Sequence, residues 1–280
     1  MNIKFYIKKI LKYIIRNIPR KHITVVVKQV EPNNLLKNKR IIITGGGRGL
    51  GYYMAQTCIA EGAEVLITGR NEKRLKESSE KLGSNCKYLV FDVKNVSEIP
   101  DFFKKASKIF NNKKIDCLVS NAGISLHEGN FRNVTEDGWD KQLNTNLKGN
   151  YFMVSNFIKY LEQQKDTSGN IIVISSERAK RADDIPYGLT KIATNSFVQA
   201  IASKVITEGI RINAVAPGVT TSDMTGFNRN ENMYTDWQNN QRVFLPEEVA
   251  KVVLFLLSDV SSCISGEIIT CDQGNYIMHW

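Results

Sequence analysis

Short apolar segments alternate with longer amphipathic segments from Arg40 onward. Each apolar segment is rich in Ile, Val or Leu and shows little polar alternation, as expected for strands covered on both faces. We expect strands at Arg40–Thr44, Glu64–Thr68, Lys87–Phe91, Ile115–Val119, Asn170–Ile174, Arg211–Val215 and Glu267–Thr270. We expect helices at Leu50–Glu61, Glu72–Leu82, Ile99–Phe110, Thr135–Gln163, Pro186–Glu208 and Pro246–Leu257. This alternation predicts an α/β fold with right-handed crossovers and a parallel sheet.

The first 35 residues have a different pattern. In Ile3–Ile18, basic residues recur every four positions opposite a row of isoleucines, which is typical of an amphipathic helix. This helix would lie on an anionic membrane surface, or its apolar stripe would pack on the body or on a neighbouring subunit. Residues 23–30 could add a strand. No apolar run is long enough for a membrane span or a signal peptide, and the absence of Ser from residues 1–32 argues against a transit peptide.

The net charge of +10 belongs to this N-terminal part. Residues 1–40 hold eleven Lys and Arg against one acid, Glu31. The rest of the chain has 27 bases and 27 acids, so it is neutral. The basic composition therefore does not indicate a nucleic-acid-binding protein. We expect an extension at 1–35 and a single domain at 36–280, a length that doubly wound folds fill as one unit.

Five cysteines are scattered along the chain without close-paired spacing. An odd number at such positions argues against a disulfide framework and against a zinc site. We expect buried thiols, no bound metal, and a reducing, cytoplasmic compartment.

A glycine-rich loop, Thr44–Gly51 (TGGGRGLG), follows the first predicted strand and opens the first predicted helix. Glycine lets the backbone turn sharply and approach a phosphate closely, and the helix N-terminus presents free N–H groups to it. At the first strand–helix junction, this loop predicts a dinucleotide site.

From this loop to the C-terminus, the chain resembles the short-chain dehydrogenase/reductase family, in particular its single-domain 3-oxoacyl-(acyl-carrier-protein) reductases. The resemblance covers about residues 36–276. It rests on the glycine loop, Asp92, Asn121-Ala122-Gly123, the segment Leu143–Gly149 (LNTNLKG), Ser175-Ser176, Tyr187-x-x-x-Lys191, Pro217-Gly218 and the tail Ser265–Gly274 (SGEIITCDQG), in that order. It implies a Rossmann-type, doubly wound sheet of seven parallel strands in the order 3-2-1-4-5-6-7, with helices on both faces.

The resemblance also implies site residues. The catalytic set would be Asn146, Ser176, Tyr187 and Lys191. The cofactor-binding set would be Gly45, Gly47, Arg48, Gly49, Leu50, Gly51, Arg70, Asp92, Val93, Asn121, Ala122, Gly123, Tyr187, Lys191, Pro217, Gly218, Thr220 and Ser222. Asn146 would hold a water that feeds protons towards Lys191, and Lys191 would hold the nicotinamide ribose.

Tyr187 and Lys191 are four residues apart, so on a helix they share a face. A nearby ammonium should lower the pKa of the phenol and make Tyr187 a general acid or base near neutral pH. The interval from Ser176 to Tyr187 is shorter than the family pattern implies. The family pattern selects Ser176 as the catalytic serine, and the short interval leaves Ser175 open.

The end of the second strand predicts the cofactor. NAD-preferring folds place an acid there for the ribose 2′-hydroxyl, whereas this chain has Thr68-Gly69-Arg70. Arg70 could pair with a 2′-phosphate, and Arg48 would face the same region. The cofactor is therefore expected to be NADP(H).

The sequence says less about the substrate than about the cofactor. The segment Thr221–Phe244, where the family builds its substrate lid, is too polar to suggest a steroid-like ligand. The run Glu177-Arg178-Ala179-Lys180-Arg181 favours an anionic substrate, and a solvated charged loop is the alternative.

The leading hypothesis is NADPH-dependent reduction of a carbonyl, with 3-oxoacyl thioesters as one substrate class. The alternatives are an NAD(P)⁺-dependent dehydrogenase of a sugar or hydroxy-acid derivative, and a non-catalytic NADP-binding or membrane-scaffold protein. The resemblance implies a homodimer or homotetramer. Peripheral membrane contact through residues 1–20 is the alternative to packing of this segment on protein.

Overall fold

The computed structural model describes residues 34–230 and 232–276. The predicted amphipathic helix at Ile3–Ile18 and the strand at 23–30 lie outside the described residues, and the extension at 1–35 stays a prediction. Within the described part, Leu36 is fully buried against the sheet, and its backbone N–H donates to the Glu61 carbonyl at 2.9 Å.

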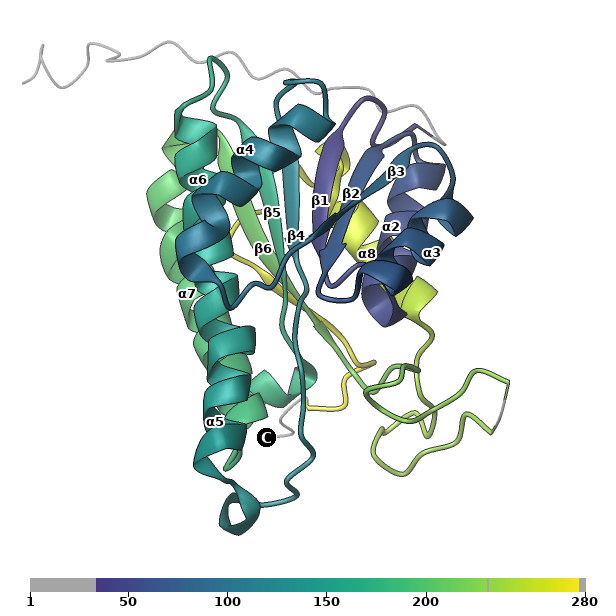
Figure 1. Ribbon diagram of the computed structural model, residues 1–280. Helices are drawn as coiled ribbons and strands as arrows, with labels where there is room; N and C mark the ends of the chain where they lie inside the picture. Colours follow the sequence, from purple (N-terminus) through teal and green to yellow (C-terminus); the bar gives the residue numbers. More distant parts are fainter. Residues whose placement is uncertain (1–33, 231, 277–280) are drawn as a thin grey trace, which may run out of the picture.

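The structure confirms the predicted fold class. Seven parallel strands form one sheet in the order β3-β2-β1-β4-β5-β6-β7. The strands are β1 (Arg40–Thr44), β2 (Glu64–Gly69), β3 (Cys86–Val90), β4 (Cys117–Ser120), β5 (Gly169–Ile174), β6 (Ile210–Pro217) and β7 (Ile268–Cys271). Helices α2 (Gly49–Ala60), α3 (Glu72–Leu82) and α8 (Pro246–Leu257) cover one face, and α4 (Ile99–Ile109), α6 (Asn150–Glu162) and α7 (Pro186–Val205) cover the other (Figure 1).

Each face of the sheet has its own apolar core. Ile41 and Ile43 of β1 pack towards α2 and α8, whereas Ile42 between them packs towards α4 and α6. Successive side chains of a strand point to opposite faces, so a strand covered on both sides must be apolar at every position. This is why the strands appear in the sequence as unbroken apolar runs.

The predicted helix Thr135–Gln163 is not one regular helix. It consists of α5 (Glu136–Gln142), a π-helical segment (Leu143–Gly149) and α6. The wider π-helical turns, which are often found at functional sites, contain Asn146. An ideal Cβ at Gly149 would lie 2.8 Å from the Val93 carbonyl, so this segment passes too close to the end of β3 for any side chain.

Smaller differences occur at other ends. The strand predicted from Ile115 begins at Cys117, because the Ile115 N–H donates to the Tyr160 hydroxyl at 3.0 Å instead of joining the sheet. Helix α7 ends at Val205 and continues as a short 3₁₀ turn to Glu208.

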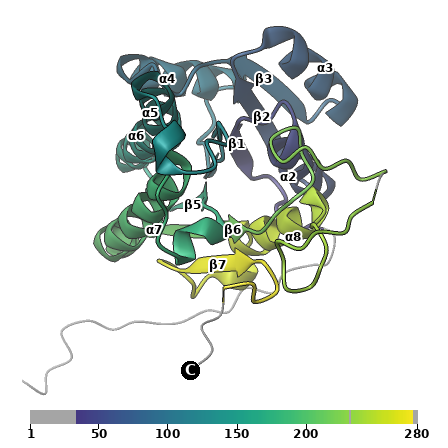
Figure 2. The same cartoon turned by 90° about the horizontal axis from the view of Figure 1, so that it is seen from below.

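The carboxyl ends of the strands meet at one edge of the sheet. The segment between β6 and α8, residues 218–245, extends from this edge as a long loop beside α2 and α8 (Figures 1 and 2). We call residues 221–244 the lid. In the described part of the chain, none of the helices is long and apolar enough to cross a membrane.

Candidate active site

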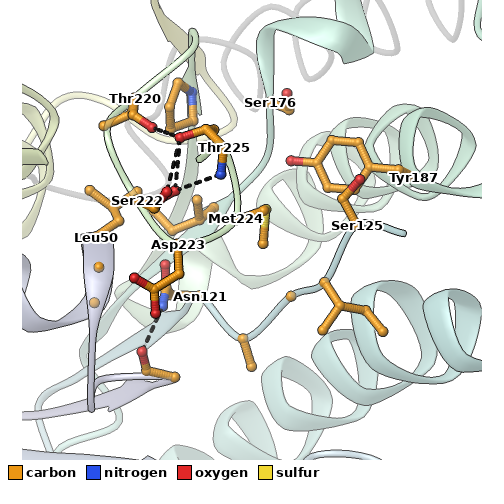
Figure 3. A pocket seen from close by; sticks show the side chains of 18 of the residues that line it. Leu50, Asn121, Ser125, Ser176, Tyr187, Thr220, Ser222, Asp223, Met224 and Thr225 are labelled. Carbon is orange, nitrogen blue, oxygen red and sulfur yellow. Dashed lines mark hydrogen bonds between the residues drawn. The ribbon is translucent and has the colours of Figure 1, made fainter. Parts of the chain in front are cut away.

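A cavity of about 770 Å³ opens at the carboxyl ends of the strands. Parallel sheets generally bind ligands at this edge. Every residue predicted to bind the cofactor lines the cavity, and so do Ser176 and the unpredicted Ser125. Figure 3 shows Ser176, Ser125 and Tyr187 on one side, with Leu50, Thr220, Ser222 and Thr225 opposite.

The glycine loop forms one end of the cavity. Gly49 has a φ of 51°, and an ideal Cβ at Gly51 would lie only 2.4 Å from the Gly45 carbonyl, so both positions require glycine. The N-cap residue of α2, Arg48, makes no capping hydrogen bond through its side chain, which leaves the first backbone N–H groups of the helix available to a phosphate. The loop therefore fits the pyrophosphate of a dinucleotide.

Side-chain hydrogen bonds fix the glycine loop to the end of β4. The Thr44 hydroxyl accepts from the backbone N–H groups of Asn121, at 2.8 Å, and Ala122, at 2.9 Å. The Asn121 side chain donates in return to the Thr44 carbonyl at 2.8 Å. The buried side-chain amide of Asn150, at the start of α6, donates to the Ala122 carbonyl at 2.9 Å and accepts from the Ser120 hydroxyl at 2.7 Å. Sequence reasoning missed Asn150, which no local motif marks.

The predicted 2′-phosphate residues differ in their surroundings. Arg70, at the end of β2, is exposed, lines the cavity and forms no salt bridge with the described residues. Arg74, in the first turn of α3, lines the same region. Arg48 instead pairs with Asp223 of the lid at 2.6 Å, although both side chains are exposed. Asp92, which the resemblance places beside the cofactor, accepts from the Lys94 N–H at 3.0 Å.

The lid begins beside the predicted nicotinamide end. Pro217 and Gly218 follow β6 and line the cavity, and the Thr220 hydroxyl donates to the Gly218 carbonyl at 2.9 Å. The Ser222 and Thr225 hydroxyls lie 3.2 Å apart and form the hydrogen-bonded group in Figure 3. These bonds hold the first turn of the lid over the cavity.

Tyr187 and Lys191 lie one turn apart at the start of α7. The Lys191 ammonium is buried, donates to the Ile174 carbonyl at 2.8 Å, and lies 5.6 Å from the centre of the Tyr187 ring. Burial lowers the pKa of Lys191 to about 8. Burial raises the pKa of Tyr187, because it disfavours the charged phenolate. The Ser176 hydroxyl and Arg178 lower this pKa, but by less.

The predicted lowering of the Tyr187 pKa is therefore wrong. Desolvation of the phenolate outweighs the favourable interactions, and the lysine that should stabilise it is itself buried and holds its proton less firmly. Tyr187 is a protonated phenol at neutral pH.

The two serines face different partners. The Ser175 hydroxyl donates to the Asn195 side chain at 2.6 Å, within the packing between β5 and α7. Ser176 begins the 3₁₀ turn Glu177–Lys180 and lies beside Tyr187 in the cavity wall (Figure 3). Both serines line the cavity, but the Ser175 hydroxyl is already bound to Asn195, so the geometry favours Ser176 as the serine that binds a ligand.

Asn146 does not line the cavity. It is fully buried, and its side chain accepts from the Ile124 N–H and donates to the Ile124 carbonyl, both at 2.8 Å. What the structure shows is a residue that anchors the chain after β4. Its role in holding a water stays a prediction.

The basic run after Ser176 is largely compensated. Arg178 forms a two-pronged ion pair with Asp183, whose side chain is fully buried, at 2.6 and 2.8 Å. Lys180 is exposed and does not line the cavity, whereas Arg181 does. Of the three basic residues in this run, only Arg181 lines the cavity without an ion pair to the described residues. None of the described residues forms a cluster of three or more His, Cys, Asp or Glu that could hold a metal.

Comparisons with known proteins agree with this geometry. A family model described as Enoyl-(Acyl carrier protein) reductase matches residues 45–275. A protein of Chlamydia pneumoniae named 3-oxoacyl-[acyl-carrier-protein] reductase FabG is 34% identical over 85% of this chain and 97% of its own length. A Claviceps purpurea protein named Short chain dehydrogenase is 32% identical over 85% of this chain and 96% of its own length. The crystal structure of gox2181 covers 88% of this chain and 99% of its own, with a TM-score of 0.80 and 28% identity. The chain therefore belongs to the short-chain dehydrogenase/reductase family of oxidoreductases.

Proposed function

We propose that this protein reduces a carbonyl compound to an alcohol with NADPH. One observation carries the proposal: Ser176, Tyr187 and Lys191 lie together in the wall of a cavity whose other end is a glycine loop fitted to a pyrophosphate. NADPH would supply the hydride. Relatives named as reductases support this direction of reaction.

The chain's own residues would handle the proton. Tyr187 is a protonated phenol at neutral pH, so it can donate to the oxygen of a bound carbonyl as that oxygen becomes an alkoxide. The neighbouring Ser176 hydroxyl would hold the same oxygen by a hydrogen bond. Lys191, fixed by the Ile174 carbonyl, is a nearby positive charge that would favour the phenolate left behind.

The preference for NADPH rests on Arg70. Its guanidinium is exposed at the end of β2, where an acid would otherwise bind the ribose hydroxyl. Arg74 adds a second cation in reach of a 2′-phosphate. Arg48 would contribute only after releasing Asp223.

Two substrate classes are supported by different observations. The names of the Chlamydia pneumoniae and Aquifex aeolicus relatives suggest a 3-oxoacyl thioester. A sugar or hydroxy-acid derivative is favoured instead by the polar side chains at the substrate end, which include Ser125, Ser176 and Glu177. An anionic substrate would depend on Arg181.

Self-association is also part of the proposal. Tyr151, Phe152 and Leu189 are large apolar side chains that are more than a third exposed on α6 and α7. Exposed apolar side chains on neighbouring helices favour pairing of two copies through this face. A cytoplasmic location, and membrane contact through residues 1–20, stay predictions.

The test is oxidation of NADPH and of NADH by the purified full-length chain with a panel of ketones, oxoacyl thioesters and keto sugars. We expect turnover with NADPH and a loss of roughly 10²- to 10⁴-fold in Tyr187→Phe. Tyr88→Phe, a tyrosine of β3 outside the cavity, is the matched control. Equal activity of Tyr187→Phe and wild type would remove Tyr187 as the acid. Tight NADPH binding without turnover on any carbonyl would favour a non-catalytic NADP-binding protein.

A further inference from the structure

The carboxyl group of Glu177 has no part in the proton transfer proposed above. It directly follows Ser176, lines the same cavity and is only 4% exposed. A carboxylate is rarely buried without partners that compensate its charge. Its neighbours therefore indicate what it is suited to bind.

Two amide groups donate to Glu177. The Gln238 side chain of the lid donates to one carboxylate oxygen at 2.8 Å, and the Asn275 side chain donates to the other at 3.3 Å. The Asn275 amide nitrogen also donates to the Trp237 carbonyl at 3.0 Å, so both of its N–H groups are used. Glu177 thus joins three segments that are far apart in the sequence.

Acceptors nevertheless exceed donors around this carboxyl. Gln238 Oε1 and Asp272 Oδ2 are buried and have no hydrogen-bond partner in the described part of the chain. An ideal Cβ at Gly218 would lie 3.2 Å from Glu177 Oε2 and 3.0 Å from Gln238 Oε1. Glu177 Oε2 and Gln238 Oε1 therefore lie close to each other beside Gly218. Of these residues, Glu177 and Gly218 line the cavity, and Gln238 packs behind Glu177.

The nearby guanidinium groups do not balance this excess. Arg178 is bound to Asp183, and Arg181 lies over the Tyr276 ring at 5.0 Å. Burial and the nearby Asp272 raise the pKa of Glu177 to about 7, despite the two amide donors. A group that brings further N–H or O–H donors would stabilise the ionised carboxylate.

We propose that Glu177, held in place by the Gln238 side chain, accepts a hydrogen bond from a hydroxyl group of the substrate, so that the preferred substrate is a hydroxylated carbonyl compound. An unsubstituted acyl chain at this position would leave the buried carboxylate with its two amide donors alone, and a site built for hydrogen bonding disfavours such a ligand. A neutral hydroxyl fits better than an ammonium group, because Arg178 and Arg181 also lie at this end of the cavity. The inference rests on the proposed function, since it names the substrate class of the same site.

The test compares two ligands that differ only in one group, 3-hydroxybutan-2-one and 3-methylbutan-2-one. The full-length chain with bound NADP⁺ is titrated with each ketone by ligand-observed NMR, and NADPH oxidation is measured in parallel. We expect the wild type to favour the hydroxy ketone by roughly 10- to 100-fold, the range for a hydrogen bond to a charged group. We expect Glu177→Gln to reduce that ratio at least about fivefold.

Two further variants complete the test. Glu177→Met, which removes both carboxylate oxygens, should abolish the preference. Glu162→Gln, at an exposed carboxyl on α6, should leave it as in the wild type. Near-UV circular dichroism and NADPH affinity establish that each variant is folded, and Glu177→Gln keeps the size of the side chain.

The outcomes separate this inference from the proposed function. A preference for the hydroxy ketone in binding, without turnover, would support the subsite and contradict the reductase proposal. Turnover of both ketones with equal affinity would support the reductase and overturn the subsite. An unchanged ratio in both Glu177 variants would also overturn it.

Discussion

Replacing Glu177 with Gln should stabilise the folded chain at alkaline pH. Between pH 4.5 and about 7 the folded chain binds more protons at this carboxyl than the unfolded chain does. The stability of the wild type therefore falls as the pH rises through this window, because ionisation is opposed by burial and by Asp272. The amide side chain that replaces the carboxyl in the variant cannot ionise and avoids this loss.

The magnitude follows from the shift. A pKa raised from 4.5 to about 7 corresponds to roughly 3 kcal/mol at pH values above both pKa values. Water reaching the cavity wall reduces this, so we expect the stability difference between Glu177→Gln and wild type to grow by about 2 kcal/mol from pH 5 to pH 8.

The assay is urea-induced unfolding of both proteins at one protomer concentration, across that pH range and without cofactor. Glu162→Gln, which removes an exposed carboxyl, is the control for the loss of one charge. Stability curves of Glu177→Gln and wild type that run parallel from pH 5 to pH 8 would refute the reasoning, because the carboxyl would then titrate alike in the folded and unfolded chains.

Three other substitutions test the packing of the site and the core. Gly51→Ala should cost roughly 1–3 kcal/mol of stability and weaken NADPH binding, because its Cβ would lie 2.4 Å from the Gly45 carbonyl; unchanged affinity in a fluorescence titration would contradict this. Phe157→Ala should cost about 3–5 kcal/mol in urea unfolding, since the ring is fully buried between α4 and the sheet, and a cost below about 1 kcal/mol would argue against that packing. Arg178→Leu should cost about 2–3 kcal/mol by leaving the buried Asp183 unpaired. Adding Asp183→Asn to Arg178→Leu should recover part of the lost stability. No recovery would show that the broken ion pair does not cause the loss.

The order of strands and helices could be predicted from the sequence because each element has its own hydrophobic period. β1 and the helices α3 and α8 have the predicted ends. The place of the glycine loop at the first strand–helix junction and the shared helix face of Tyr187 and Lys191 could also be predicted, because their residues are neighbours in the chain. Spacing along a loop or a helix sets the relative positions of such residues.

The tertiary structure alone decided which charged side chains have a partner and which partner each of them has. Arg48 pairs with a lid residue 175 positions away, and Glu177 is bound by Gln238 and Asn275, which are 61 and 98 positions away. No local pattern marks such pairs. They form because the crossovers bring loops that follow different strands to the same edge of the sheet.

The same reason explains the predictions that were wrong or incomplete. Burial, which only the fold determines, reversed the expected pKa direction of Tyr187 and gave Arg178 a buried partner. The sequence by itself determined the fold class, the order of the motifs and the kind of cofactor site, because these depend on periodicity and on residues close in the chain. The tertiary structure decided the electrostatics of the substrate end, because the energy of a charge depends on how deeply it is buried and which groups surround it.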